Sequence, residues 1–174
     1  MASVVQDATG GVTPVRSIGG QVAEAVRLRV GATRTEAAKE AVRLLGRVGL
    51  PEPERRAREY PHQFSGGMNQ RAMIALAIAG SPKLLIADEA TTALDVTVQA
   101  QILDLIGDLR DSLGMGVIFV THDLGLVAQY AEQIVVMYAG RVVERAETAA
   151  LFAAPRHPYT CLLYTSPSPR DPSI

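Results

Sequence analysis

The sequence predicts an α/β fold in which a helical region is followed by a parallel sheet. In the first half of the chain, apolar residues recur at helical spacing, and Ala37, Ala41, Leu44 and Val48 form one such stripe. After Ser81 the pattern changes to short apolar runs that alternate with helical stretches, which is typical of parallel strands joined by helices. The 174 residues, 48% of them hydrophobic, are enough for one domain with a real core.

Composition and charge exclude several classes of function. The formal net charge is −1, whereas a nucleic-acid-binding surface normally shows a basic excess. The longest apolar stretches, such as residues 73–79 and 117–120, are far too short to cross a bilayer, and no basic segment precedes a long apolar run at the N-terminus. Cys161 is the only cysteine, which excludes an intramolecular disulfide. We expect a cytoplasmic protein that does not bind nucleic acid.

The first half is predicted to begin with a loop and continue with helices. Residues 1–20 contain glycines, a proline and few periodic apolar positions, which predicts a loop. Helices are expected over 21–28 and 35–50. Thr35 is a candidate N-cap of the second helix, and Gly49 helps to end it.

A charged connection with several prolines, residues 51–61, leads to the second half. Ser65 stands where the N-cap of a long helix over 68–79 belongs. The apolar runs beyond Ser81 are typical of strands buried in a parallel sheet. The elements expected there, in order, are strand 83–87, helix 96–113, strand 116–120, helix 124–131, strand 133–138, a turn at Gly140 into a hairpin partner at 141–145, and a short helix at 148–153.

Two adjacent carboxylates close the first of these strands. Asp88 and Glu89 would be costly after an apolar strand unless they lie at the carboxyl edge of the sheet, where ligands bind. Neighbouring side chains on a strand point to opposite faces, so the two acids cannot have the same role. In a phosphoryl-transfer site the first would support the Mg²⁺ shell and the second would face the attacking water. The structural alternative is an ordinary acidic turn after a buried strand.

Two further features bear on this edge. Ser65, Gly66 and Gly67 offer a hydroxyl and backbone N–H groups at the positive end of a helix dipole, which suits an anion, although an ordinary N-cap would look the same. His122 ends the next strand, and a histidine there could donate a hydrogen bond to a γ-phosphate. A lone histidine with a purely structural role is the alternative.

Four stretches share their order and spacing with one known family. They are YPHQFSGGM at 60–68 with QR at 70–71, PKLLIADE at 82–89, TTALD at 91–95 and QAQIL at 99–103. Together they closely resemble the ATPase subunits of the dipeptide/oligopeptide/nickel group of bacterial ATP-binding-cassette (ABC) importers. The resemblance implies a fragment of a P-loop NTPase fold, with a helical subdomain followed by the second half of a RecA-like parallel-sheet core.

The resemblance also implies roles for single residues at an ATP site. Ser65, Gly66 and Gly67 match the signature motif, which contacts the γ-phosphate of an ATP held by the opposite subunit. Asp88 matches the Walker B aspartate that supports Mg²⁺, and Glu89 matches the catalytic glutamate that polarises water.

Three more residues receive roles in the same way. Asp95 belongs to the D-loop at the dimer interface, and His122 matches the switch histidine that grips the γ-phosphate. Gln6 matches the Q-loop glutamine that contacts Mg²⁺ and senses the membrane partner. Residues 8–13 depart from the family pattern, so a polar tail without this role is the alternative at Gln6.

The resemblance divides the chain into five parts. They are a Q-loop remnant at 1–14, the helical subdomain at 15–80, the core part with Walker B, D-loop and switch histidine at 81–146, a C-terminal extension at 147–160, and a tail at 161–174. The tail resembles the translation of a transposon-based sequencing adapter and is rich in proline and serine, which predicts disorder whether it is an artefact or natural.

The phosphate-binding motif Gly-x-x-x-x-Gly-Lys-Ser/Thr does not occur in these residues. The two lysines, Lys39 and Lys83, follow Ala38 and Pro82 rather than a glycine. We therefore expect an N-terminally truncated fragment that is inactive alone.

The expected function of the parent protein is ATP-driven import of peptides or a related solute. Two ATPase subunits would close head to tail around two ATP molecules with Mg²⁺, at the cytoplasmic face of the inner membrane. The partners would be permease subunits and, indirectly, an extracytoplasmic solute-binding protein. The solute, whether peptide, nickel or glutathione, stays open because those partners select it. The alternatives are a soluble ABC ATPase of DNA repair or translation, whose usual coiled-coil insertions and basic arms are not seen here, and a non-functional fragment.

Overall fold

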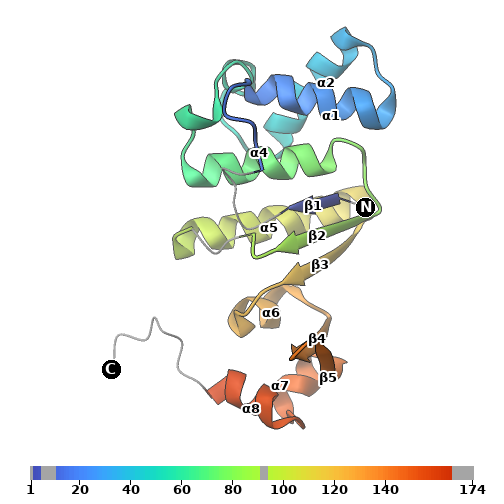
Figure 1. Cartoon of the computed structure of the whole chain (residues 1–174), viewed down its shortest axis with the longest axis vertical. Helices are drawn as coiled ribbons and strands as arrows, with labels where there is room; N and C mark the ends of the chain where they lie inside the picture. The colour runs from blue at the N-terminus through green and yellow to red at the C-terminus, as the bar shows by residue number, and fades with distance from the viewer. Residues whose placement is uncertain (1, 5–10, 91–93, 166–174) are drawn as a thin grey trace. The chain divides into compact units, whose positions relative to one another are not determined.

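A computed structural model describes residues 2–4, 11–90 and 94–165 (Figure 1). The chain divides into two compact units, Met1–Val120 and Thr121–Ile174. The first contains a parallel sheet and a helical layer, and the second contains a hairpin with short helices. These two units are defined by contacts in space, whereas the five parts expected from the sequence were defined by family motifs. The five parts stay a prediction.

The helical layer is built from three helices, α1 (Ile18–Val30), α2 (Arg34–Arg47) and α4 (Gly66–Ile78), which pack on one another (Figure 1). The connection between α2 and α4 contains the short helices α3 (Pro53–Arg56) and η1 (Pro61–Gln63). The three predicted helices are therefore confirmed. Their inward faces make the main core, which includes Ile18, Val22, Val26, Leu44, Leu45, Ile74 and Ile78.

The caps of α2 show where the sequence prediction was right and where it was wrong. Thr33, not Thr35, is the N-cap, because Thr33 and Glu36 form a reciprocal capping box while Thr35 already lies inside the first turn. The Thr33 amide donates to Glu36 Oε2 at 2.9 Å, and the Glu36 amide donates to Thr33 Oγ1 at 3.3 Å. Gly49 follows the last turn at a φ of 74°, which confirms its predicted role in ending the helix.

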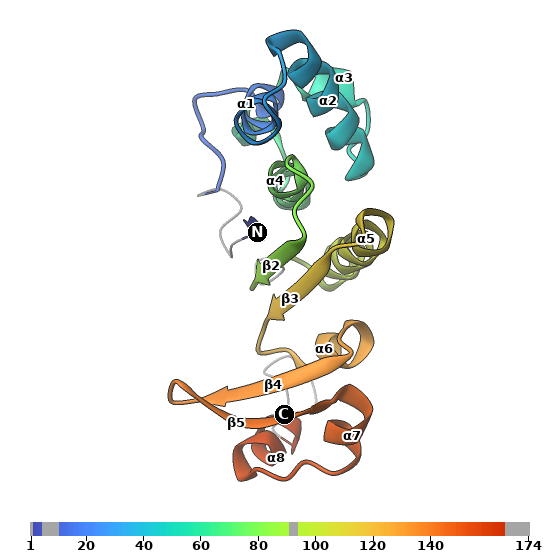
Figure 2. The same cartoon turned by 90° about the vertical axis from the view of Figure 1, so that its right-hand side faces the viewer.

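The sheet has the strand order β1 (Ala2–Val4), β2 (Leu84–Asp88), β3 (Gly116–Val120), and all its pairs are parallel. A loop was predicted for residues 1–20, and β1 corrects this prediction. Its three residues form a strand because they pair with β2. Helix α5 (Val96–Leu113), confirmed at its predicted bounds, joins β2 to β3. Figure 2 shows α4 and α5 close to the sheet.

Only one face of this sheet lies against the main core. Leu85 and Ala87 of β2 are buried there, together with α5 residues such as Ile102. On the opposite face, Ile118 and Val120 of β3 are about half exposed, at 47% and 48%. The strands at 83–87 and 116–120 are therefore confirmed as strands, but the expectation that both are buried was wrong for β3. Among the described residues, β3 pairs with β2 alone, which makes it an edge strand.

The second unit begins with α6 (Leu124–Tyr130) and continues with the antiparallel pair β4 (Gln133–Tyr138) and β5 (Arg141–Glu147). Ala139 and Gly140 both have positive φ, as the two central residues of a tight hairpin turn of the primed type require. Helix α7 (Thr148–Ala153) packs under the hairpin, and Leu151, Ile134 and Val136 form a small core. The predicted helices, strand and hairpin of this region are confirmed.

Helix α8 (Pro158–Thr165) corrects the disorder predicted from residue 161 onward, at least as far as residue 165. Two side chains hold its start. The Glu144 carboxylate accepts from the amides of Arg156 at 2.9 Å and His157 at 3.0 Å, and His157 Nδ1 accepts from the Tyr159 amide at 3.1 Å. Residues 166–174 of the predicted tail lie outside the described residues. No helix in the described ranges is both long and apolar enough to cross a membrane.

Candidate functional site

The turn that begins α4 leaves its polar groups open to a ligand. Ser65 is the N-cap, as predicted, and its Oγ accepts from the Met68 amide at 3.3 Å. Gly66 and Gly67 are the first helical residues, and the amides of a first turn have no acceptor within their own helix. Ser65 and Gly66 are exposed. The turn therefore presents amides and a hydroxyl at the positive end of a helix dipole, which fits a phosphate.

The two acids at the end of β2 differ in their backbone as well as in their side chains. Asp88 is the exposed last residue of the strand, and its register partner is Val120. Glu89 has a φ of 45°, and its amide donates to the Val120 carbonyl at 2.9 Å. A left-handed conformation at a residue other than glycine or asparagine costs about 1–2 kcal/mol. Such strain is kept where the surrounding structure enforces it, often at functional sites.

Asp95 starts α5 and lies close to the signature turn. Its Oδ1 accepts from the Val98 amide at 2.9 Å, so Asp95 is the N-cap of α5. A Cβ atom placed on Gly66 would lie 3.5 Å from Leu94 Cδ2, and one on Gly67 would lie 2.7 Å from Val98 Cγ1. The start of α4 and the start of α5 are therefore in direct contact. Of the predicted D-loop, Ala93 to Asp95, only Ala93 lies outside the described residues.

Figure 1 shows α4 beginning, β2 ending and α5 beginning on one side of the first unit. The structure thus gathers Ser65, Asp88 and Asp95 at one side, as expected for side chains at the carboxyl edge of a parallel sheet. Among the described residues, no group of three histidine, cysteine or acidic side chains could hold a metal ion. One exposed carboxylate such as Asp88 still suits Mg²⁺, which is usually held by one or two carboxylates and by substrate phosphates.

Two predicted site residues are not tested by this geometry. His122 is exposed at the start of the second unit, next to a turn in which Asp123 Oδ1 accepts from the Gly125 amide at 2.9 Å. Its role as switch histidine stays a prediction. Gln6 lies outside the described residues, so its role also stays a prediction.

Arg71 links three helices near this site, a role that the sequence analysis did not predict. Its guanidinium donates to the Val48 carbonyl at 2.8 Å and to Gln101 Oε1 at 3.4 Å. It therefore links α4 to the end of α2 and to α5. Periodicity gives no signal for such a link, because it depends on how closely the helices approach.

Comparisons with known proteins agree with this arrangement. The sequence model of the family described as "ABC transporter" matches residues 4–92. The chain is 54% identical over 166 residues to a probable peptide ABC transporter ATP-binding protein of Sinorhizobium fredii, covering 95% of this chain and 50% of that protein. It is 55% identical over 163 residues to a putative peptide import ATP-binding protein of Brucella melitensis biotype 1, covering 94% and 48%. The chain thus spans about half the length of these relatives.

Solved structures show the same fold. A dimeric post-hydrolysis state of the ATP-binding cassette MJ0796, bound to ADP and Pi, superposes with a TM-score of 0.71 at 28% identity, over 84% of this chain and 63% of that one. The cbiO1 protein of Clostridium perfringens, part of the ABC transporter complex cbiONQ, gives a TM-score of 0.76 at 28% identity, over 87% and 59%. The predicted fold, part of an ABC ATPase in the P-loop NTPase class, is confirmed. By sequence and by fold, the chain belongs to the ABC transporter family.

Proposed function

We propose that this chain is part of an ATP-binding and ATP-hydrolysing subunit that drives import of di- or oligopeptides, or of a related solute. The observation that carries the proposal is the open Ser65 turn at the start of α4, in contact with the Asp95 end of α5. The names of the relatives at 54% and 55% identity, which refer to peptide transport and peptide import, support the solute class.

The proposed roles rest on the match of these residues to the family motifs, and the position of the Ser65 turn supports them. Ser65 and the amides of Gly66 and Gly67 bind the γ-phosphate of an ATP held by a second subunit, because this turn is open and carries a positive dipole. Asp88 contributes an oxygen ligand to Mg²⁺. Glu89 orients the attacking water and accepts its proton. ATP supplies the phosphoanhydride bond whose hydrolysis drives transport.

His122 and Gln6 complete the proposed site. His122 donates a hydrogen bond to the γ-phosphate, and Gln6 contacts Mg²⁺ and the region that meets the membrane partner. These two roles rest on the match of both residues to the family motifs. In a complete subunit that carries its own phosphate cradle, substitution of the residue matching His122 or Gln6 is expected to lower hydrolysis while far-ultraviolet circular dichroism shows the helix content unchanged.

The proposed assembly contains two ATPase subunits, permease subunits and, indirectly, an extracytoplasmic solute-binding protein. The subunit would lie peripherally at the cytoplasmic face of the inner membrane and would not bind nucleic acid. The dimeric cassette among the structural neighbours, and the neighbour that is part of a transporter complex, support an assembly of this kind.

We also propose that these 174 residues do not hydrolyse ATP alone. They contain no Gly-x-x-x-x-Gly-Lys-Ser/Thr motif, so the cradle for the β- and γ-phosphates has to come from other residues. Phosphate release from ATP by the purified chain should stay at background. Hydrolysis that is abolished by Glu89→Gln would contradict this proposal.

A complementation assay tests the whole proposal. A complete peptide-importer ATPase, such as the Sinorhizobium relative, would be disabled in its own signature motif and mixed with this chain. Hydrolysis should rise, because Ser65 completes the ATP site of the other subunit. Ser65→Asp should remove at least about nine-tenths of the stimulation, since aspartate keeps the N-cap but repels a phosphate. Gly107→Ala, in open space on α5, is the matched control and should stimulate normally. Absence of stimulation by the unchanged chain would overturn the proposed function.

A further inference from the structure

Helices α4 and α5 approach each other closely at Gly67 and Val98. A Cβ atom on Gly67 would lie 2.7 Å from Val98 Cγ1, a distance that real Cβ atoms essentially never show. Gly66, one residue earlier, has room, because its Cβ would lie 3.5 Å from Leu94 Cδ2. The two glycines of the signature turn therefore differ, and only the second leaves no space for a side chain.

The backbone gives no separate reason for glycine at either position. Neither Gly66 nor Gly67 has a positive φ, and both lie in the first turn of a regular helix. Alanine would favour such a helix over glycine. Within this chain, the side chain of Val98 is what a Cβ atom at position 67 would meet.

Val98 has little freedom to move aside. It is the third residue of α5, and its amide donates to Asp95 Oδ1 at 2.9 Å. A valine in a helix has one strongly preferred χ1 rotamer, so Cγ1 is not the end of a flexible side chain. Val98 is half-buried and packs against the main core. Its side chain therefore fixes how closely the start of α4 can approach the Asp95 end of α5.

A second link lies one turn further along both helices. Arg71 is four residues after Gly67, Gln101 is three residues after Val98, and the two side chains meet at 3.4 Å. The same guanidinium donates to the Val48 carbonyl at 2.8 Å. Helices α4 and α5 are thus held together at two successive levels, the apolar one at the signature turn and the polar one behind it.

We propose that Val98 is a positioning residue for the proposed ATP site, and that it acts through Gly67. It sets the separation between the signature turn and the Asp95 turn, so that the two turns move as one body when they meet a second subunit. This inference rests on the proposed function, in which Ser65 faces the partner subunit, and on the match of Asp95 to the D-loop expected at the dimer interface. Val98 itself touches no nucleotide.

The test is a set of paired substitutions in the complementation assay. Gly67→Ala should lower the stimulated ATPase rate by about tenfold or more, because overpacking pushes the two turns apart. Val98→Ala removes Cγ1, so the Gly67→Ala/Val98→Ala pair should recover to within about threefold of Val98→Ala alone. Val98→Thr keeps the shape of valine, so Gly67→Ala/Val98→Thr should be as poor as Gly67→Ala. Every variant would be assayed at a temperature where circular dichroism shows it folded.

Two further measurements separate positioning from simple loss of structure. The Tm of the chain should fall by about 3–10 °C in Gly67→Ala and rise again in the pair with Val98→Ala. Gly107→Ala, which also adds a methyl group to a helical glycine but meets nothing within 4 Å, should leave both the rate and the Tm unimpaired. Val98→Ala alone should lower the maximal stimulated rate while the KM for ATP stays within about twofold, since the ATP is held by the other subunit.

Rescue decides the inference. If Gly67→Ala stays inactive when Val98 is also alanine, glycine is needed there for the approach of the phosphate, and Val98 has no positioning role. If the unchanged chain gives no stimulation, the proposed function fails and the positioning role fails with it. If the unchanged chain stimulates hydrolysis but the Gly67→Ala/Val98→Ala pair does not recover, only the positioning role of Val98 is overturned.

Discussion

The helical layer of the first unit and the hairpin of the second unit bury their apolar residues to very different degrees. Ile18, Leu45 and Ile74 of the helical layer are completely buried. Val135 and Met137 of β4 are 50% and 58% exposed. The helices and strands of both regions were predicted from their apolar patterns. The pattern of a segment therefore does not show how completely its apolar face is buried.

The difference follows from the number of elements that meet each apolar face. In the helical layer, α1 and α2 pack on each other and both pack on α4, most of whose residues are buried. The hairpin has α7 against one face, while the side chains of alternate residues on β4 point away from it. A two-stranded hairpin is marginally stable in water. The helical layer therefore carries its own core, whereas the hairpin depends on a small one.

Truncation of a core residue should show this contrast most strongly. Leu45→Ala is expected to lower the free energy of unfolding by about 2–5 kcal/mol, because it leaves a cavity in the closed core. Met137→Ala should change it by less than about 1 kcal/mol, because the side chain is already largely in water. Urea unfolding followed by circular dichroism measures both. Equal losses at the two positions would break the comparison.

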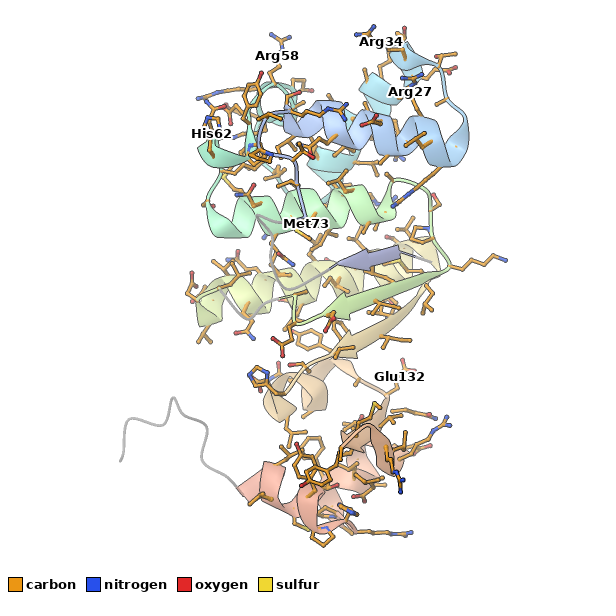
Figure 3. The ribbon with its side chains drawn as sticks, viewed as in Figure 1. Arg27, Arg34, Arg58, His62, Met73 and Glu132 are labelled. Atoms are coloured by element: carbon orange, nitrogen blue, oxygen red, sulfur yellow. The ribbon has the colours of Figure 1, made fainter. Side chains whose placement is uncertain are left out.

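A polar link inside the helical layer should give a smaller effect. Arg29 Nη1 donates to the carbonyls of Leu76 and Ala77, both at 2.9 Å, where α4 ends. A cation there satisfies the last carbonyls and favours the helix dipole. Arg29→Met is expected to cost about 1–2 kcal/mol of unfolding free energy. Arg27 extends from the last turn of the same helix (Figure 3) and provides the matched control.

Arg27→Met should cost less than about 0.5 kcal/mol, since it removes a charge of the same kind without a described bond to α4. Thermal unfolding of the two variants under the same conditions decides between them. If both cost the same, the Arg29 bonds add nothing beyond general electrostatics, and the helical layer rests on its apolar contacts alone.

The hairpin turn should respond to a residue that suits its backbone. Ala139 has a φ of 48°, which alanine adopts at a cost, while Gly140 at 75° does not share this cost. Ala139→Asn creates the Asn-Gly pair preferred in such turns and should stabilise the second unit by about 0.5–1 kcal/mol. Amide hydrogen exchange in β4 and β5 should slow while exchange in α1 and α2 is unchanged. Faster exchange in the hairpin would contradict this assignment of the turn.

Acid should weaken both regions, each through its own carboxylate. The Thr33 hydroxyl and amide lower the pKa of Glu36 below its usual 4.5. The pKa of Glu144 is lowered by the Thr160 hydroxyl and by the amide of Arg156, although Thr160 Oγ1 forms no hydrogen bond of ordinary geometry. Since both folded pKa values lie below 4.5, this stabilisation is complete above pH 4.5 and is lost as the pH falls through the folded values.

The two carboxylates can be separated by substitution. Glu144→Gln should flatten the loss of protection in α8 below pH 4.5, and Glu36→Gln should flatten it at the start of α2. Hydrogen exchange between pH 5 and pH 3, corrected for the intrinsic rate, measures both. A Glu144→Gln chain that loses α8 protection as steeply as the unchanged chain would rule out Glu144 as the acid-sensitive group.

The sequence predicted the long elements well because their signals are local. Helix α5 was placed at its observed bounds, since Asp95 caps its start and Gly114 ends it with a φ of 60°. Asp88 and Ser65 were predicted at the ends of a strand and a helix, and they lie there. Ends of elements are where residue type and local hydrogen bonds agree, so they can be recognised without a tertiary structure.

The features that escaped prediction depend on contacts distant in sequence. Strand β1 has only three residues and is defined by its pairing with β2. Helix α8 begins where Glu144 reaches the amides of Arg156 and His157, twelve and thirteen residues away. The contact between Gly67 and Val98 joins two regions that lie about thirty residues apart, and nothing in their sequences indicates that they touch. Spacing along the chain cannot reveal how closely two helices approach.

The exposed face of β4 has a practical consequence for handling this chain. Residues 134–138, IVVMY, contain no charge, no proline and no glycine, and segments of this kind can stack between molecules into cross-β assemblies. The nearest protection on this face comes from the facing strand, where Arg145 lies opposite Val135. Concentrated preparations are expected to aggregate through this segment. Met137→Lys, which places a charge on the open face, is the first change to make for a sample that stays monodisperse.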